Sequence, residues 1–219
     1  GYFTTTKIYT NKKDNELFVV EPDIIFCTTV IGGGTDTYTT QHAADSIYVQ
    51  VGRNFWYLND GSTTGDSFTS AAGDDANDGL TKSTPKLTLG AIISLMSPGD
   101  TVLIDSGRFT LGASVAPKSW DAFIGMDSHN TVLNMASLYK FTITNESNVV
   151  LRDLAIHDPN INAIATNNAD SCEFTRLRIL NGAGTGASVE INNGSDSNRI
   201  SQLWITGGAG YGINLIGSD

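Results

Sequence analysis

The segment from 74 to 78 gathers four oxygen-bearing side chains within a short stretch of chain. Asp74, Asp75, Asn77 and Asp78 carry carboxylate and amide oxygens, which are ligands that a hard cation such as Ca2+ prefers. The segment lacks the distal bidentate glutamate of an EF-hand, so a calcium ion here is expected to be structural rather than catalytic. The alternative is a solvated turn whose Asp and Asn side chains bind their own backbone. No motif requires a cofactor.

Trp204 and Arg178 are the residues expected to bind a carbohydrate. Alternation along short strands places Ala155, Arg178 and Trp204 in one outward-facing column. A large aromatic ring can lie against the apolar face of a sugar while polar neighbours bind its rim hydroxyls. Alternatively, Trp204 packs beneath the following loop, 207–212, or against a neighbouring chain, since isolated exposed apolar residues are common.

The sequence contains no recognisable catalytic constellation. A glycosidase needs two carboxylates a fixed short distance apart, and the nearest pair, Asp153 and Asp158, falls in turns where Asp is common for local reasons. Glu173 is expected beside Arg199 in a second outward column, as an ordinary surface ion pair. The three histidines are scattered along the chain, so neither a zinc site nor a serine triad is indicated.

A repeat of paired short strands in the C-terminal half must position these side chains. The segments 149–156, 172–179 and 198–205 align without gaps, and the first apolar column recurs after 23 residues (151 to 174) and then 26 (174 to 200). The columns are Leu151, Phe174 and Ile200; Leu154, Leu177 and Leu203; and Ile156, Ile179 and Ile205. Each unit is too small to bury its own apolar face, so the units must stack as a solenoid.

Polar residues mark the corners of this repeat. Pairs at 152–153, 175–176 and 201–202 separate the two strands of each copy, which predicts a bend between adjacent faces of one coil. Asparagines precede the strand pairs at 145, 167–168 and 192–193. Their stacked side-chain amides are expected to form a ladder along the solenoid axis. An earlier and less regular coil is visible at 131–135, with Phe141 and Ile143.

The upstream residues supply the start of the solenoid. Residues 2–60 predict a series of short strands, and 60–79 a long polar loop of the kind that is usually functional or a boundary. Residues 85–97 show the apolar spacing of an amphipathic helix, which Pro98 and Gly99 end. Residues 101–105 then alternate as a strand.

Composition limits the class of partner. Charged residues make up only 16% of the 219 residues, and the 23 glycines suit many short strands joined by turns. The formal net charge of -10, without a cluster of Lys and Arg, argues against a nucleic-acid partner. Neutral glycans, cations or proteins are easier partners. No apolar run approaches the ~20 residues of a membrane helix, so no membrane insertion is expected.

Three segments carry a resemblance to a known family. They are WYLNDGSTTGD (56–66), GDDANDGLTKSTPKLTL (73–89) and SPGDTVLIDSGRFT (97–110), and together with the repeat they resemble the pectin-lyase-like right-handed parallel β-helix proteins over roughly residues 55–219. That family includes polysaccharide lyases, bacterial surface proteins and phage tailspikes. The resemblance implies, for a lyase, carboxylates that hold calcium against a uronate and an Arg or Lys that abstracts a proton. No Asp cluster lies in register with Arg178, so a lyase site is not predicted within this segment.

The expected organisation is a β-rich attachment segment at 1–54 followed by an all-β, right-handed parallel β-helix at 55–219. The match of 217–219 to 194–196 indicates that the repeat stops before another strand pair is due, so a truncated β-helix is expected. We expect an extracellular, cell-surface or virion-surface protein, either a rigid stalk or a glycan-recognising surface. Its partners would be a polysaccharide or cell-surface glycan and, at the N-terminal segment, a surface or virion protein; three chains could form a homotrimer. The alternative is a polysaccharide lyase or hydrolase whose active site lies mostly downstream of residue 219.

Overall fold

The computed structural model describes residues 8–11, 16–19, 28–31, 34–37, 53–159, 162–180, 188–207 and 212–217. The chain divides into two compact units, residues 1–53 and 54–219. In the first unit, β1 (Ile8–Asn11) pairs antiparallel with β2 (Glu16–Val19), and β3 (Thr28–Ile31) pairs antiparallel with β4 (Gly34–Thr37). The described part of this unit therefore consists of two short antiparallel strand pairs.

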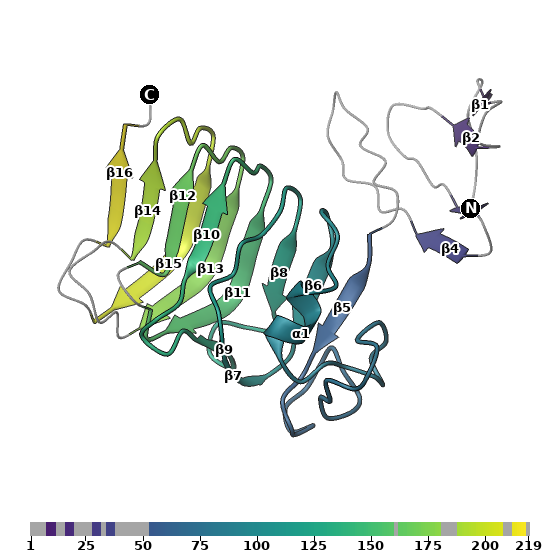
Figure 1. Ribbon diagram of the computed structural model, residues 1–219, viewed down its shortest axis with the longest axis horizontal. Helices are drawn as coiled ribbons and strands as arrows, with labels where there is room; N and C mark the ends of the chain where they lie inside the picture. The colour runs from purple at the N-terminus through teal and green to yellow at the C-terminus, as the bar shows by residue number, and fades with distance from the viewer. Residues whose placement is uncertain are drawn as a thin grey trace. The chain divides into compact units, whose positions relative to one another are not determined.

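The second unit is a β-solenoid of about 4 turns. One sheet has the order β15-β13-β11-β8-β6-β5, with β9 also paired to β11 and β7 paired to β9, and the other has the order β10-β12-β14-β16 (Figure 1). The elements are β5 (Phe55–Leu58), α1 (Leu89–Ile93), β6 (Thr101–Ile104), β7 (Gly107–Thr110), β8 (Ala122–Gly125), β9 (Thr131–Asn134), β10 (Phe141–Thr144), β11 (Val150–His157), β12 (Ile164–Asn167), β13 (Glu173–Leu180), β14 (Val189–Asn192), β15 (Arg199–Thr206) and β16 (Ile213–Ile216). Every pairing between these strands is parallel. The predicted all-β parallel β-helix is confirmed.

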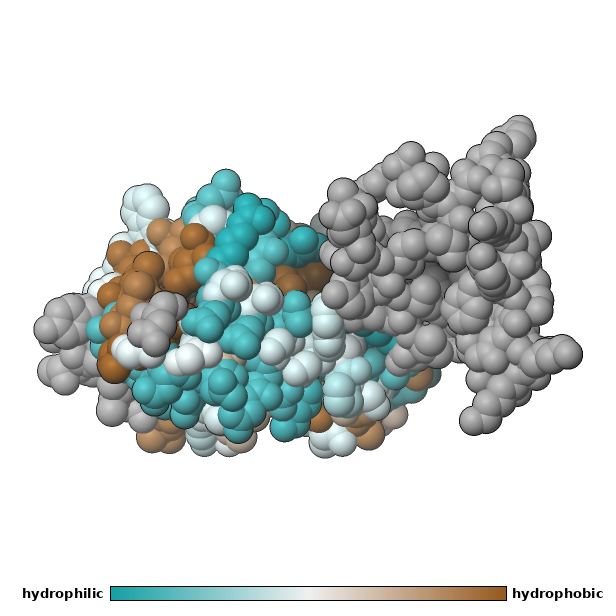
Figure 2. All heavy atoms as spheres, turned by 90° about the horizontal axis from the view of Figure 1, so that it is seen from above, coloured by the Kyte–Doolittle hydropathy of each residue, from teal (hydrophilic) through white to brown (hydrophobic). Residues whose placement is uncertain are grey.

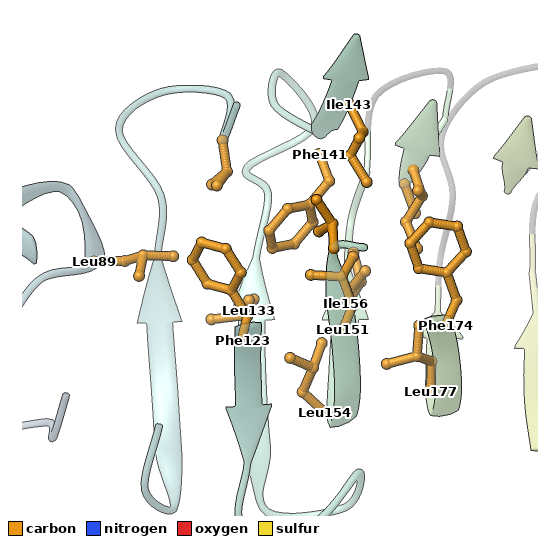
Figure 3. Packing of buried hydrophobic residues seen from close by; sticks show 14 of the residues in the cluster. Leu89, Phe123, Leu133, Phe141, Ile143, Leu151, Leu154, Ile156, Phe174 and Leu177 are labelled. Atoms are coloured by element: carbon orange, nitrogen blue, oxygen red, sulfur yellow. The ribbon is translucent and has the colours of Figure 1, made fainter. Parts of the chain in front are cut away.

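The apolar columns of the repeat form the core as expected. Leu151, Leu154 and Ile156 on β11 are in register with their column partners on β13, and these with β15. The side chains of these three β11 residues are fully buried, and Figure 3 shows them pointing into the space between the sheets. Phe123 on β8 meets Phe141 on β10 edge to face, with ring centroids 5.5 Å apart. Stacking of coils therefore supplies the burial that no single coil provides.

A left-handed residue makes the corner of each late coil. Asp153, Arg176 and Gln202 have φ values of 60°, 51° and 52°, and each is the second residue of a polar pair that was expected to bend the chain. Left-handed backbone is costly for residues other than Gly, Asn and Asp. Since all three coils share it, the conformation belongs to the coil architecture and not to one site.

The asparagine ladder forms between two of the expected positions. The Asn168 side-chain amide donates to Oδ1 of Asn145 over 2.9 Å. Asn145, Asn168 and Asn193 also share a left-handed backbone, with φ of 56°, 50° and 39°. Backbone amides of Asn145 and Asn168 donate to the next coil at 3.0 and 2.9 Å. The ladder thus ties one corner of adjacent coils together.

The amphipathic helix is much shorter than the expected 85–97. Lys86 instead forms a parallel bridge with Leu58, and its amide donates to the Tyr57 carbonyl, so the chain is still extended there. Thr88 caps the helix by accepting from the Ala91 amide at 3.3 Å. Only Leu89–Ile93 is helical, and Leu89 and Ile92 enter the core of the first coil. Pairing with β5 outweighs helical periodicity over the first residues of the segment.

The long polar loop 60–79 is held in place by a buried carboxylate. Asp105, just after β6, accepts from the amides of Ser67, Phe68 and Thr69 at 2.7–2.8 Å and from the Thr69 hydroxyl at 2.9 Å. The Asn59 side-chain amide lies 2.7–2.9 Å from three further acceptors of the loop. These bonds satisfy buried polar groups that would otherwise be costly. The described contacts give the loop a structural role.

The last coil exposes the side chains that its predecessors bury. Ile213 and Leu215 of β16 continue the inward columns of Val189 and Ile191, yet both are exposed. Figure 2 shows hydrophobic residues gathered toward the end of the unit that carries the last strands. No helix among the described residues has the length and apolar character needed to cross a membrane.

Candidate functional site

A shallow groove of about 400 Å³ lies over the corner of the late coils. Its wall on one side is the loop 127–129, and Trp204 stands at the other end. The remaining lining residues are Asp153, Arg176, Leu177, Arg178 and Gln202. The structure therefore brings together Trp204 and Arg178, the two residues expected to bind a glycan, which are also direct partners on β15 and β13.

An insertion in an earlier coil creates the wall of this groove. Ile124 of β8 pairs with Arg152, and Val132 of β9 pairs with Ala155. Only two residues separate Arg152 from Ala155, whereas the chain between Ile124 and Val132 has room for a protruding loop. At Gly125 an added Cβ would lie 2.2 Å from the Asp153 carbonyl oxygen, so only glycine permits the close approach of the two coils.

Asp127 organises the inserted loop. Its Oδ1 accepts from the amides of His129 at 2.6 Å and Asn130 at 3.0 Å, and its Oδ2 accepts from the Asn130 side chain at 2.8 Å. Partial burial opposes the charge, but the hydrogen bonds from His129 and Asn130 outweigh it and lower the pKa of Asp127 from its usual 3.8. The loop therefore presents a fixed, ionised carboxylate to the groove.

Asp153 and Arg176 form a closed ion pair on the groove floor. Arg176 uses both its Nε and its Nη2 on the two oxygens of Asp153, the second at 2.7 Å. The hydrogen bond and the charge of Asp153 raise the pKa of Arg176. Bidentate geometry of this kind is stronger than a single contact. Glu173 and Arg199 were expected to pair, and they are register partners on β13 and β15. Among the described residues, however, the ion pair on β13 is that of Arg176 with Asp153.

Trp204 and Arg178 are accessible but differ in their attachments. Trp204 keeps 62% of its surface exposed, and residues 208–211 of the loop that could cover it lie outside the described residues. Arg178 donates from Nη1 to the Ser128 carbonyl at 3.5 Å, which supports the inserted loop from the floor. Further along this outward face, Arg108 lies 3.4 Å from His157 Nδ1 and 3.5 Å from Asp158. Burial and the positive charge of Arg108 lower the pKa of His157 despite Asp158.

The four candidate calcium ligands face local partners instead of one another. Asp74 accepts from the Ala76 amide at 2.9 Å, and the Asn77 side chain donates to the Pro85 carbonyl at 2.8 Å. Asp75 accepts from two amides and a hydroxyl at residues 87–88, and Asp78 accepts from the amide and hydroxyl of residues 80 and 84. Hydrogen bonds from Thr84 and Leu80 lower the pKa of Asp78.

The four side chains are engaged in hydrogen bonds and do not converge on one point. Across the described residues, no group of three or more His, Cys, Asp or Glu side chains could hold a metal. The hydrogen bonds instead fasten the end of the polar loop to the segment 80–88. These contacts are those that the turn interpretation expects, calcium at this segment stays a prediction, and no step of any reaction is assigned to a metal here.

Among the lining residues that sequence reasoning did not assign to a site, five have a charged, imidazole or amide side chain, namely Asp127, His129, Asp153, Arg176 and Gln202. Three of them occupy the bend column, which the alignment identified only as a corner. The other two lie in the irregular coil, where the chain between residues 124 and 132 is longer than the corresponding corner of the later copies. That excess length was the one signal in the sequence that could have located the groove.

The groove lacks the proton donor that glycoside hydrolysis requires. Two carboxylates, Asp127 and Asp153, line it, but the general acid of a glycosidase must have a raised pKa. The pKa of Asp127 is lowered, and Asp153 is engaged with Arg176 through both oxygens. The arrangement therefore suits binding better than acid catalysis.

Comparison with known proteins adds a distant structural similarity. No protein-family model matches the chain, and no curated protein matches it. A solved structure titled "Rhamnogalacturonan lyase" is similar with a TM-score of 0.46 and 10% sequence identity, over 75% of this chain and 56% of that one. The chain thus spans little more than half of that protein's length. The parallel β-helix of this chain rests on its own strand register, described above.

Proposed function

We propose that residues 54–219 form a rigid β-helix that presents a carbohydrate-recognising groove, in a protein that works outside a cell or on a virion surface. The observation that carries this proposal is the exposed ring of Trp204 at the end of a groove lined by charged and amide side chains. An apolar plane beside a few fixed polar groups suits a saccharide. The groove's volume of about 400 Å³ lies near the lower end of the ~300–1,000 Å³ of ligand sites.

Rigidity supports this function. Trp204 and Gln202 lie on β15, which pairs with β13 on both sides of the corner at Gln202, and the loop wall is fixed by Asp127 and Arg178. A ligand would therefore meet a surface that is already in place, which lowers the entropy lost on binding. The strand pairs of residues 1–53 are proposed to belong to an attachment segment for a surface or virion protein.

A glycan array tests the proposal. The full chain is expected to bind at least one glycan, and Trp204→Ala is expected to weaken that binding about tenfold or more, since a stacked aromatic ring contributes roughly 1–3 kcal/mol. Trp204→Phe, which keeps a flat ring, should retain part of the affinity. Leu95→Ala removes another exposed apolar side chain, on the segment after α1, and should change nothing. Unchanged binding by Trp204→Ala would rule out the aromatic platform.

A further inference from the structure

The charges that line the groove cancel one another. Asp127 and Asp153 supply two negative charges, and Arg176 and Arg178 supply two positive charges. The whole chain carries a formal net charge of -10. A polyanion approaching this surface therefore meets a repulsive long-range field that the four lining charges, which sum to zero, do not offset.

The side-on fork of Arg176 is already occupied, so a ligand carboxylate could reach only the Nη1 side of this guanidinium. Its Nε and Nη2 are both bound to Asp153. A ligand carboxylate that displaced Asp153 from this guanidinium would leave Asp153 with Arg152, whose Nε lies 3.7 Å from its Oδ2, and would add a second negative charge beside it. The exchange gains one charge-assisted pair and loses another.

Arg178 is the remaining cation, and its position also disfavours an anion. Nη1 of Arg178 donates to the Ser128 carbonyl, on the same loop that holds the ionised Asp127. A ligand carboxylate at Arg178 would face the wall that carries Asp127 on one side and the corner that carries Asp153 on the other. Hydroxyl groups, by contrast, can donate to these carboxylates and accept from the guanidinium groups.

We infer that the groove takes a neutral saccharide, in which hydroxyls bind the carboxylates and guanidinium groups while one sugar face lies on Trp204, and that it rejects uronate sugars. The inference rests on the proposed function and specifies its ligand class. The polar side chains act through paired donors and acceptors, and the aromatic ring acts through contact area. Specificity then comes from the fixed negative charges that a carboxylate would have to approach.

Matched polymers provide the test. Neutral glucan, galactan and mannan oligosaccharides are compared with the same oligosaccharides after oxidation of their C6 hydroxyls to carboxylates, with the full chain, by calorimetry or biolayer interferometry. At least one neutral oligosaccharide is expected to bind, and its oxidised form to bind about tenfold more weakly at low salt. Equal or tighter binding of every oxidised form would overturn the neutral-ligand inference and leave the glycan-binding function standing. Binding of neither form would overturn both.

A substitution within the ion pair gives a second arm. Asp153→Asn preserves the left-handed corner, because asparagine tolerates positive φ, and frees the guanidinium of Arg176. This variant is expected to gain affinity for the oxidised oligosaccharides by about tenfold. Asp196→Asn makes the same change of charge at an exposed position outside the groove lining and should leave the preference unchanged. A gain that is equal in both variants would mean that net charge, and not the groove, sets the preference.

Discussion

Trp56 and Trp204 show how the first coil and the late coils use the same residue types differently. Trp56 is 5% exposed, and its indole donates to the buried Asp100 at 2.8 Å. Trp204 has its ring in solvent beside a groove whose acidic residues are partly exposed. Around the first coil buried carboxylates accept backbone amides and hold loops together, whereas around the groove the partly exposed Asp153 is paired with a guanidinium and the partly exposed Asp127 accepts amides of its own loop. Burial therefore separates structural from candidate binding residues better than residue type does.

The largest expected effect comes from the carboxylate that holds the polar loop. Asp105→Ala leaves three backbone amides and a hydroxyl at residues 67–69 without their acceptor, and partly buried donors that lose their shared acceptor at once are costly. The free energy of unfolding is expected to fall by about 3–5 kcal/mol. Urea denaturation followed by circular dichroism measures it. A loss below about 1 kcal/mol would contradict the structural role assigned to this loop.

The two tryptophans give the next contrast. Trp56→Phe removes a buried hydrogen bond to Asp100 and leaves space in the core, so a loss of about 2–3 kcal/mol is expected. The Trp204 side chain lies mostly in solvent, so Trp204→Phe should change the free energy of unfolding by less than about 0.5 kcal/mol. Thermal and urea unfolding of both variants measure the difference. Equal losses of stability in the two variants would contradict the distinction between a buried, structural Trp56 and an exposed Trp204.

A pH titration tests a third buried carboxylate of the first coils. Burial raises the pKa of Asp121 to about 6. The amides of Lys118 and Gly99 favour its charged form and lower the pKa, whereas the negative charges of Asp100 and Glu146 raise it further. At a pH between the ordinary pKa of 3.8 and about 6, the folded state therefore holds the Asp121 proton more tightly than the unfolded state does. Relative to Asp121→Asn, the wild-type chain should gain about 2 kcal/mol of stability as the pH falls from about 7 to 4.

The comparison with the asparagine variant matters because other groups titrate nearby. His157 has a lowered pKa, so its contribution to stability is lost as the pH falls below the ordinary 6.5. That change is common to both proteins and cancels in the difference. Urea denaturation at a series of pH values gives both curves, and parallel curves would show that Asp121 titrates normally.

The smallest effect is expected at the groove floor. Asp153→Asn breaks the ion pair with Arg176, whose side chain is 47% exposed, and exposed pairs contribute little because solvent screens them. Stability should change by less than about 1 kcal/mol, and the change should shrink further in high salt. Unfolding in low and high salt measures it. A loss as large as that of Asp105→Ala would make this pair structural.

The core could be read from the sequence, because its signal is periodic. Leu151, Phe174 and Ile200 recur at nearly equal intervals, and alternation then fixes which neighbours face inward. The corners were found for the same reason, although their left-handed backbone was not. The prediction that failed was the start of the helix. Residues 85–88 have a helical pattern, but the pairing of Lys86 with β5 keeps the chain extended there.

The groove escaped prediction because its parts come from two kinds of sequence. Trp204 and Arg178 follow the repeat, whereas Asp127 and His129 belong to an insertion that breaks it. The Asp and Asn residues at 74–78 show the opposite situation, since their local clustering suggests a cation whereas their described contacts are hydrogen bonds within the loop. Their hydrogen-bond partners at 80–88 are reached only when the loop closes, which spacing along the chain does not reveal.

The insertion before β9 has an implication for how such a protein can change over generations. β8 and β9 keep their register with β11 although the chain between them is longer than in the later coils. Residues can thus be added or lost at a corner while the stacked strands remain as they are. New recognition surfaces could arise at any coil by lengthening one corner, so ligand preference can diverge among descendants that share an unaltered scaffold.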